Sequence, residues 1–277
     1  MSGLKNFGSA FSNWLDHSRR TEELLSYLAE YTRTSLPEQK RLIIFAQGRT
    51  GSNLLENLLV STGYFRKNGE KLNTQYKQEI RFPISYLSGL SKLRPQRHFI
   101  CRVKPYHLTE DRKNPVDPVR FLQALSDRGW QMVYLKRENK VMHALSNLIA
   151  EARSGYHKFD DQREHLTITV DCMYFSQWVE KRLHFEQVEE EVLTHFQDYE
   201  SVVYEDDLEK PAAHPATVAR VLDFLELERR PAIAINKKIN TLALPELITN
   251  YDEFIDCVYR SNWQKYLPES DRMQKAR

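Results

Sequence analysis

The sequence predicts an α/β fold, a single domain in which helices flank a central, mostly parallel sheet. Four short segments are apolar without polar alternation, as strands buried on both faces are: 42–46, 99–103, 131–135 and 201–204. Each segment is followed by a polar or charged elbow. Helical patterns then follow several of these elbows, and strands separated by helices are joined by right-handed crossovers and run parallel.

The elements are expected in this order. Residues 1–35 form a helical N-terminal extension that ends before Pro37, with Leu24, Leu25, Leu28 and Tyr31 on one face. Strand 42–46 leads through a turn into a helix whose buried stripe is Leu54, Leu55, Leu58 and Leu59. A long amphipathic helix fills 174–196, and its apolar stripe is predicted to be core or a dimer face rather than a cofactor site. The polar stretches 66–97 and 154–166 are expected to be irregular and to be substrate-facing or lid segments.

Composition sets limits on the class of protein. The 277 residues are 41% hydrophobic and 28% charged, with a net charge of +2, which is too balanced to indicate a nucleic-acid partner. No apolar run approaches the roughly 20 residues of a transmembrane helix, and no secretory signal follows Met1, so we expect a cytoplasmic protein. The three cysteines are widely spaced, which indicates neither a disulfide framework nor a metal site.

The first candidate site is the turn 47–53, between the first predicted strand and its helix. Gly48 and Gly51 let the backbone approach a ligand closely, and the free N–H groups of the helix N-terminus favour an anion. Arg49 adds a cationic fork, and the hydroxyls of Thr50 and Ser52 add donors. The turn resembles a P-loop in place and chemistry, but it lacks the Lys and the glycine spacing of a Walker A motif.

The second candidate site follows the strand 131–135. Arg137 stands at the end of that strand, and Ser146 lies on the helix that comes next. Both could hold a second phosphate group, so the two sites together suit a ligand that is charged at both ends.

At this point the sequence resembles the PAPS-dependent sulfotransferases, which use 3′-phosphoadenosine 5′-phosphosulfate (PAPS), and in particular the bacterial carbohydrate branch of trehalose and nodulation-factor type. In that family a turn like 49–55 holds the 5′-phosphosulfate, and a segment like 135–146 holds the 3′-phosphate through its Arg and Ser. Further segments resemble the family in the same order, at 69–70, 102–107, 152–157, 203–208 and 247–251. The resemblance covers about 41–267, and it departs from many relatives at Asn53, Lys136 and His143.

The resemblance implies roles for individual residues. Arg49, Thr50, Gly51, Ser52 and Asn53 would bind the 5′-phosphosulfate, with Arg49 nearest the bridging oxygen, while Arg137 and Ser146 would bind the 3′-phosphate. Glu70 is the expected general base toward a hydroxyl acceptor, His107 is the rival base, and Lys104 would balance the charge of the sulfonate. The chemistry needs no metal, and no carboxylate pair for magnesium is evident.

Two other readings stay open. A small-molecule kinase of P-loop type would need a Lys in the anion turn and acidic magnesium ligands. A non-catalytic protein that binds adenosine bisphosphate would keep the nucleotide site without turnover. The expected partner is a small hydroxyl compound, a sugar, glycolipid or other alcohol, and the sequence leaves open whether the chain forms a homo-oligomer.

Overall fold

The computed structural model describes residues 3–74, 78–93, 95, 97–155, 167–233, 243–267 and 272, with only the backbone described at 3–17 and 154–155. Five parallel strands form the sheet in the order β2-β3-β1-β4-β5. They are β1 (Arg41–Phe45), β2 (Phe65–Lys67), β3 (His98–Val103), β4 (Gln131–Lys136) and β5 (Glu200–Val203). Every described pairing is parallel, with Leu42 opposite Ile100 on one side and Gln131 on the other, so the predicted fold class is confirmed.

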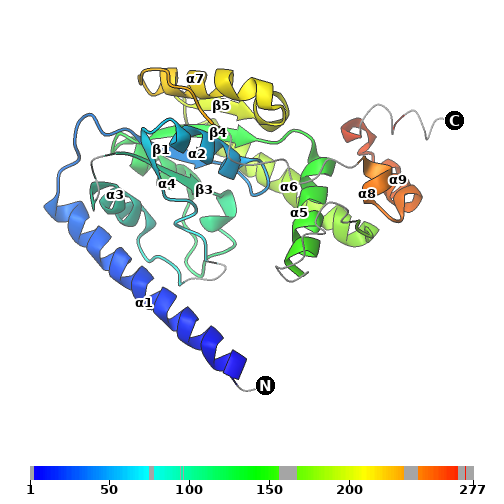
Figure 1. Ribbon diagram of the computed structural model, residues 1–277, viewed down its shortest axis with the longest axis horizontal. Coiled ribbons are helices and arrows are strands. Elements are labelled where there is room, and N and C mark those ends of the chain that lie inside the picture. The colour runs from blue at the N-terminus through cyan, green and yellow to red at the C-terminus, as the bar shows by residue number, and fades with distance from the viewer. Residues whose placement is uncertain are drawn as a thin grey trace.

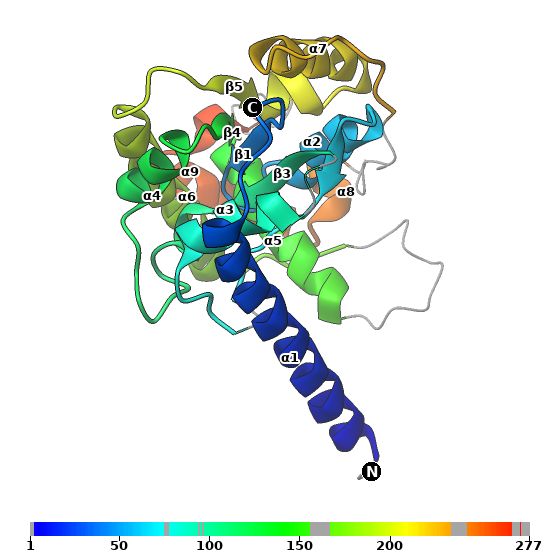
Figure 2. The same cartoon turned by 90° about the vertical axis from the view of Figure 1, so that its left-hand side faces the viewer.

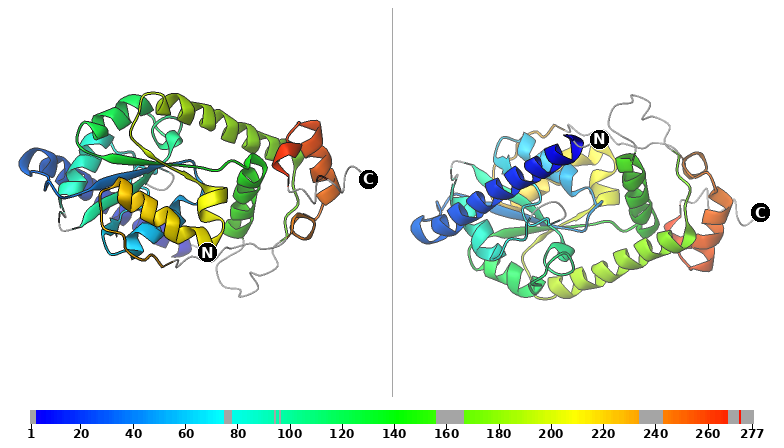
Figure 3. Two further views of the ribbon diagram at one scale, coloured as in Figure 1. Left: turned by 90° about the horizontal axis from the view of Figure 1, so that it is seen from above. Right: turned by 90° about the horizontal axis from the view of Figure 1, so that it is seen from below.

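Helices cover both faces of the sheet, as Figure 3 shows. The longer helices are α1 (Gly3–Thr32), α2 (Ser52–Ser61), α3 (Pro83–Leu93), α4 (Pro118–Ser126), α5 (Lys140–Gly155), α6 (Cys172–Leu193), α7 (His214–Phe224) and α9 (Tyr251–Arg260). Short elements are α8 (Leu244–Leu247), the 3₁₀ turns η1 (Pro105–His107), η4 (Pro211–Ala213) and η5 (Gln264–Tyr266), and the π-helical turn η3 (Tyr204–Leu208).

Successive residues of β1 point into different hydrophobic clusters, which is why the strand is apolar throughout. Leu42 and Ile44 pack with α2 and α7, whereas Ile43 and Phe45 pack with α3, α4 and the end of α6. A third cluster joins α5, α6 and α9 beside the sheet, on the right of Figure 1. The long helix α6 runs from the third cluster to the first. Its stripe Phe175, Val179, Phe185 and Val192 is buried, which makes it core rather than a dimer face.

The segment 66–97 is more regular than the sequence indicates. It contributes the edge strand β2 and the helix α3, so the prediction of an irregular stretch is wrong for those residues. Helix α3 packs closely against α1: a Cβ at Gly89 would lie 1.7 Å from the carbonyl oxygen of Ser26, so this position requires glycine. The other predicted irregular stretch, 154–166, lies almost wholly outside the described residues.

The N-terminal helix makes its contacts with a face that the sequence does not single out. Its small residues Ser26 and Ala29 are buried, while Leu24 and Leu28 of the predicted stripe remain exposed. The N-terminal half of α1 projects away from the sheet in Figures 1 and 2.

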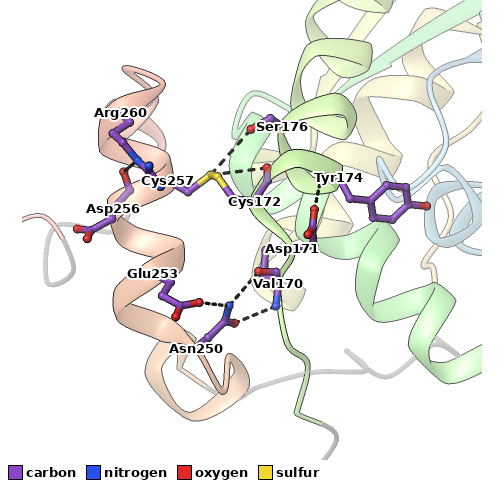
Figure 4. The surroundings of a disulfide bond; sticks show 10 residues. All are labelled: Val170, Asp171, Cys172, Tyr174, Ser176, Asn250, Glu253, Asp256, Cys257 and Arg260. Carbon is purple, nitrogen blue, oxygen red and sulfur yellow. Dashed lines mark hydrogen bonds between the residues drawn. A yellow bond between two sulfur atoms is a disulfide. The ribbon is translucent and has the colours of Figure 1, made fainter.

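Cys172 and Cys257 form a disulfide between α6 and α9, which corrects the expectation that no disulfide is present. The two residues are 85 positions apart, and folding alone brings them together at the start of α6, where Asp171 caps the helix by accepting a hydrogen bond from the Tyr174 amide (Figure 4). Nearby, Asn250 bridges the start of α9 to Val170 with two hydrogen bonds of 2.9 and 3.0 Å.

Candidate functional site

The turn between β1 and α2 has the backbone of an anion cradle. Arg49 and Gly51 both adopt positive φ angles, 69° and 89°, in alternation with ordinary residues. Such alternation turns successive N–H groups toward one point. Gly51 can have no side chain, because a Cβ there would lie 2.8 Å from the ring of Tyr204. A Cβ at Gly48 would lie 2.5 Å from the hydroxyl of Tyr106.

Five backbone amides of this turn, from Arg49 to Asn53, donate no hydrogen bond within the described part of the chain. They lie at the N-terminus of α2, where the helix dipole adds a positive potential. The Thr50 hydroxyl differs from the expectation, because it is buried and donates to the Gln47 carbonyl at 2.8 Å. Thr50 therefore offers its amide rather than its hydroxyl to a ligand.

Arg49, Ser146 and Arg137 meet at one side of the turn. Nε of Arg49 donates to Oγ of Ser146 at 3.1 Å, and Arg137 donates to the Arg49 carbonyl at 3.2 Å. Desolvation lowers the pKa of Arg49, and the hydroxyls of Tyr204 and Tyr106 act against that shift. The two predicted phosphate sites are thus adjacent, and these two hydrogen bonds link their residues.

The guanidinium of Arg137 is held from two sides. It lies 4.4 Å from the ring centre of Tyr204 and 3.7 Å from the carboxylate of Glu205. The carboxylate of Glu205 also accepts hydrogen bonds from the amides of Glu138 and Asn139 at 3.0 Å each, and so it fixes the elbow before α5. Burial lowers the pKa of Arg137, with Tyr204 and Glu205 opposing the shift.

Glu70 follows β2 and lies in a cluster of cations. Its two carboxylate oxygens contact Arg102 at 3.0 Å and Lys104 at 2.8 Å, and Asn73 donates a third hydrogen bond at 3.0 Å. Burial acts to raise the pKa of Glu70, but Lys104 and Arg102 outweigh it and hold that pKa below its ordinary value. Lys104 also faces the anion turn, since a Cβ at Gly48 would lie 3.5 Å from its Nζ.

His107 is 1% exposed and stays neutral. Burial, together with the nearby charge of Lys104, lowers its pKa to about 3. Nδ1 accepts from the Lys104 amide at 3.4 Å, so the proton of the neutral ring is on Nε2, which lies 3.7 Å from Glu70. The ring therefore presents a donor to Glu70 and no free basic nitrogen.

A buried polar layer below the turn was missed by the sequence analysis. Gln47 donates to Glu189 at 3.1 Å and to the Arg182 carbonyl at 3.2 Å, while Tyr134 donates to the same Glu189 oxygen at 3.3 Å. Burial raises the pKa of Glu189 to about 7. The available signal was that Arg182 and Glu189 fall on the apolar stripe of α6, where a charge needs a partner.

The site residues come from the carboxyl ends of neighbouring strands and therefore lie in the order of the sheet. Glu70 follows β2, Lys104 follows β3, the anion turn follows β1, Arg137 follows β4 and Tyr204 follows β5. The chain order reverses at β1, and ligands of open α/β sheets bind at such a point. Within the described ranges, no three His, Cys, Asp or Glu residues are grouped so that they could hold a metal ion.

No described helix is both long and apolar enough to cross a membrane. In comparisons with known proteins, no family model and no curated protein matches the sequence. Among solved structures, a sulfotransferase from Alicyclobacillus acidocaldarius is similar at 13% identity, with a TM-score of 0.44, over 82% of this chain and 95% of that one.

Proposed function

We propose that this protein is a sulfotransferase that moves a sulfuryl group from PAPS to a hydroxyl of a small acceptor, a carbohydrate or glycolipid. One observation carries the proposal: a carboxylate, a lysine, a cradle of amides without partners in the described chain and a largely buried arginine follow one another at the carboxyl ends of neighbouring strands. A nucleotide with phosphate groups at its 5′ and 3′ positions would extend across the carboxyl ends of these strands. The resemblance at 41–267 supports the same assignment, with 1–35 as an extension of a single catalytic domain.

The residues present fit the donor. The amides of Arg49, Thr50, Gly51, Ser52 and Asn53 would bind the 5′-phosphosulfate, and their lack of partners in the described chain supports this role. Arg137 and Ser146 would bind the 3′-phosphate. When bound, PAPS supplies a sulfuryl group attached to a phosphate oxygen, which is the leaving group.

Protein groups would then act on the transfer in three ways. Glu70 would accept the proton of the acceptor hydroxyl, with the buried Nε2–H of His107 directed at its carboxylate. Lys104, which lies between Glu70 and Gly48, would neutralise the sulfonate. Arg49 and the amides of the turn would stabilise the charge that develops on the leaving phosphate oxygen.

The two alternatives have less support. A kinase of P-loop type would place a Lys in the turn, where the chain has Arg49, Thr50, Gly51 and Ser52. A non-catalytic binder would have no use for Glu70, whose lowered pKa keeps it ionised beside the cradle.

Calorimetry with adenosine 3′,5′-bisphosphate and AMP tests the nucleotide assignment. Charge-assisted hydrogen bonds contribute roughly 1.5–3 kcal/mol each, so we expect about tenfold or more preference for the bisphosphate. Arg137→Ala should abolish that preference and leave AMP binding nearly unchanged. The matched control is Arg229→Ala, which removes a surface arginine paired with Asp223 and should preserve it.

Equal affinities of the parent protein for the two nucleotides would refute the 3′-phosphate site. Transfer itself is tested by incubating the protein and PAPS with small-molecule extracts and searching by mass spectrometry for compounds that gain one sulfuryl group. The absence of any such compound, with bisphosphate binding intact, would favour the non-catalytic alternative.

A cytoplasmic location remains our proposal, while the Cys172–Cys257 disulfide is a bond more typical of oxidising compartments. Cell fractionation combined with alkylation of free thiols checks both. Free thiols at both positions in a cytosolic fraction would agree with the proposed location.

A further inference from the structure

The hydroxyl of Tyr106 lies on the first glycine of the anion turn. Tyr106 belongs to η1, directly after β3, and its hydroxyl accepts a hydrogen bond from the Gly48 amide at 3.1 Å. Two ammonium groups lie near its ring, that of Lys104 at 5.4 Å and that of Lys181 at 5.9 Å from the ring centre. The hydroxyl therefore sits between the strand end that provides Lys104 and the turn that provides Arg49.

A further cation lies near Tyr106 on α6. Arg182 is 2% exposed and interacts electrostatically with Tyr106. It also contacts Gln47 at 3.4 Å and lies 5.1 Å from the ring centre of Trp178. No described carboxylate is within ion-pair distance of Arg182, so its charge remains available to the turn.

The hydrogen bonds of the Tyr106 hydroxyl leave part of its hydrogen-bonding capacity unused. A tyrosine hydroxyl has two acceptor positions and one proton. The Gly48 amide, which can only donate, occupies one of the acceptor positions. The O–H proton has no acceptor among the described residues, so it is free to be donated at the mouth of the anion turn.

We propose that Tyr106 is a further catalytic residue, whose hydroxyl donates a hydrogen bond to a non-bridging oxygen of the sulfuryl group. This proposal rests on the sulfotransferase assignment. In the transfer, the acceptor oxygen forms a bond to sulfur, its proton passes to Glu70, and the bond between sulfur and the phosphate oxygen breaks with its electrons on the phosphate. Tyr106 keeps its proton throughout and stabilises charge on the oxygen that faces the acceptor side of the turn.

Tyr106→Phe tests this role, because the change removes one oxygen and preserves the ring that lies near Lys104 and Lys181. We expect affinity for PAPS to fall about tenfold, while affinity for adenosine 3′,5′-bisphosphate, which has no sulfuryl group, stays the same. Turnover at saturating PAPS should fall about 10²-fold, as when one donor of an oxyanion hole is removed. The matched control is Tyr174→Phe, which removes a hydroxyl bonded to Glu151 on the surface and should change neither quantity.

The outcomes separate the two proposals. Equal loss of PAPS and bisphosphate affinity in Tyr106→Phe would mean that Tyr106 only shapes the turn, which refutes its catalytic role. Parental PAPS affinity and turnover in the variant would refute it as well. If the parent binds PAPS no better than the bisphosphate and transfers nothing, the sulfotransferase assignment itself fails and the role of Tyr106 with it.

Discussion

His107→Asn should make the stability of the protein less dependent on pH. When the pH is lowered from about 7.5 to about 5, the free energy of unfolding of the parent should fall by about 2 kcal/mol more than that of the variant. In the folded state the pKa of His107 is about 3, mainly because the ring is buried and Lys104 is close. In the unfolded chain a histidine titrates near 6.5. Between these two values the unfolded state binds the extra proton, so stability falls as the pH falls.

The magnitude follows from the distance between the assay pH and the unfolded pKa. Each pH unit below about 6.5 reduces the free energy of unfolding by about 1.4 kcal/mol for this group, until the pH approaches the folded pKa. Asn is a suitable replacement because its side-chain oxygen can still accept from the Lys104 amide, the bond now made by Nδ1. The variant therefore loses the titrating group and keeps an acceptor.

The assay is urea unfolding of the parent and the variant at the two pH values. The quantity of interest is the change in unfolding free energy with pH, because the substitution also changes packing at both pH values. His195→Asn removes an exposed imidazole and is the matched control, which should keep the parental pH dependence. If His107→Asn keeps the parental pH dependence as well, the His107 ring is not held neutral in the folded protein, and His107 is again a candidate for the base.

Two further predictions concern the base and the disulfide. Glu70→Gln should lower turnover about 10²–10⁴-fold at saturating PAPS with little change in nucleotide affinity, measured by initial rates and calorimetry, and near-normal turnover would retire Glu70 as the base. Reducing the Cys172–Cys257 bond, which closes a loop of 85 residues, should destabilise the protein by roughly 2–4 kcal/mol, and an unchanged thermal midpoint in reductant would contradict this.

The sequence predicts the central strands and their parallel arrangement because burial on both faces leaves an unbroken apolar run, as in β1. It does not predict α3, whose serines and Gly89 read as a loop. That helix is stabilised by contact with α1, where Gly89 allows the backbone at Ser26 to approach. A contact between two segments that lie far apart in the chain leaves no periodic signal in either of them.

The same distinction applies to the site. Arg49, Gly51 and Arg137 were identified because each belongs to a short local pattern at a strand end, and the structure brings them together. The roles of Tyr106 and Arg182 depend on α6 packing next to the turn. The two residues are 76 positions apart in the chain, so no local spacing predicts that they interact. Glu70 and Lys104 were both identified, but the ion pair between them required the β2–β3 pairing.

The charges at the carboxyl end of the sheet explain why an anion should bind there, although the chain carries a net charge of only +2. Arg182 is buried and the side chain of Arg137 is 10% exposed. Desolvation lowers the pKa of each, which means that their charged forms are poorly solvated in the free protein. Glu70 balances Lys104, but Arg182 has no described carboxylate at ion-pair distance. A bound polyanion would supply the missing negative charge, so the local desolvation of these two arginines favours the ligand that the free amides of the turn are arranged to hold.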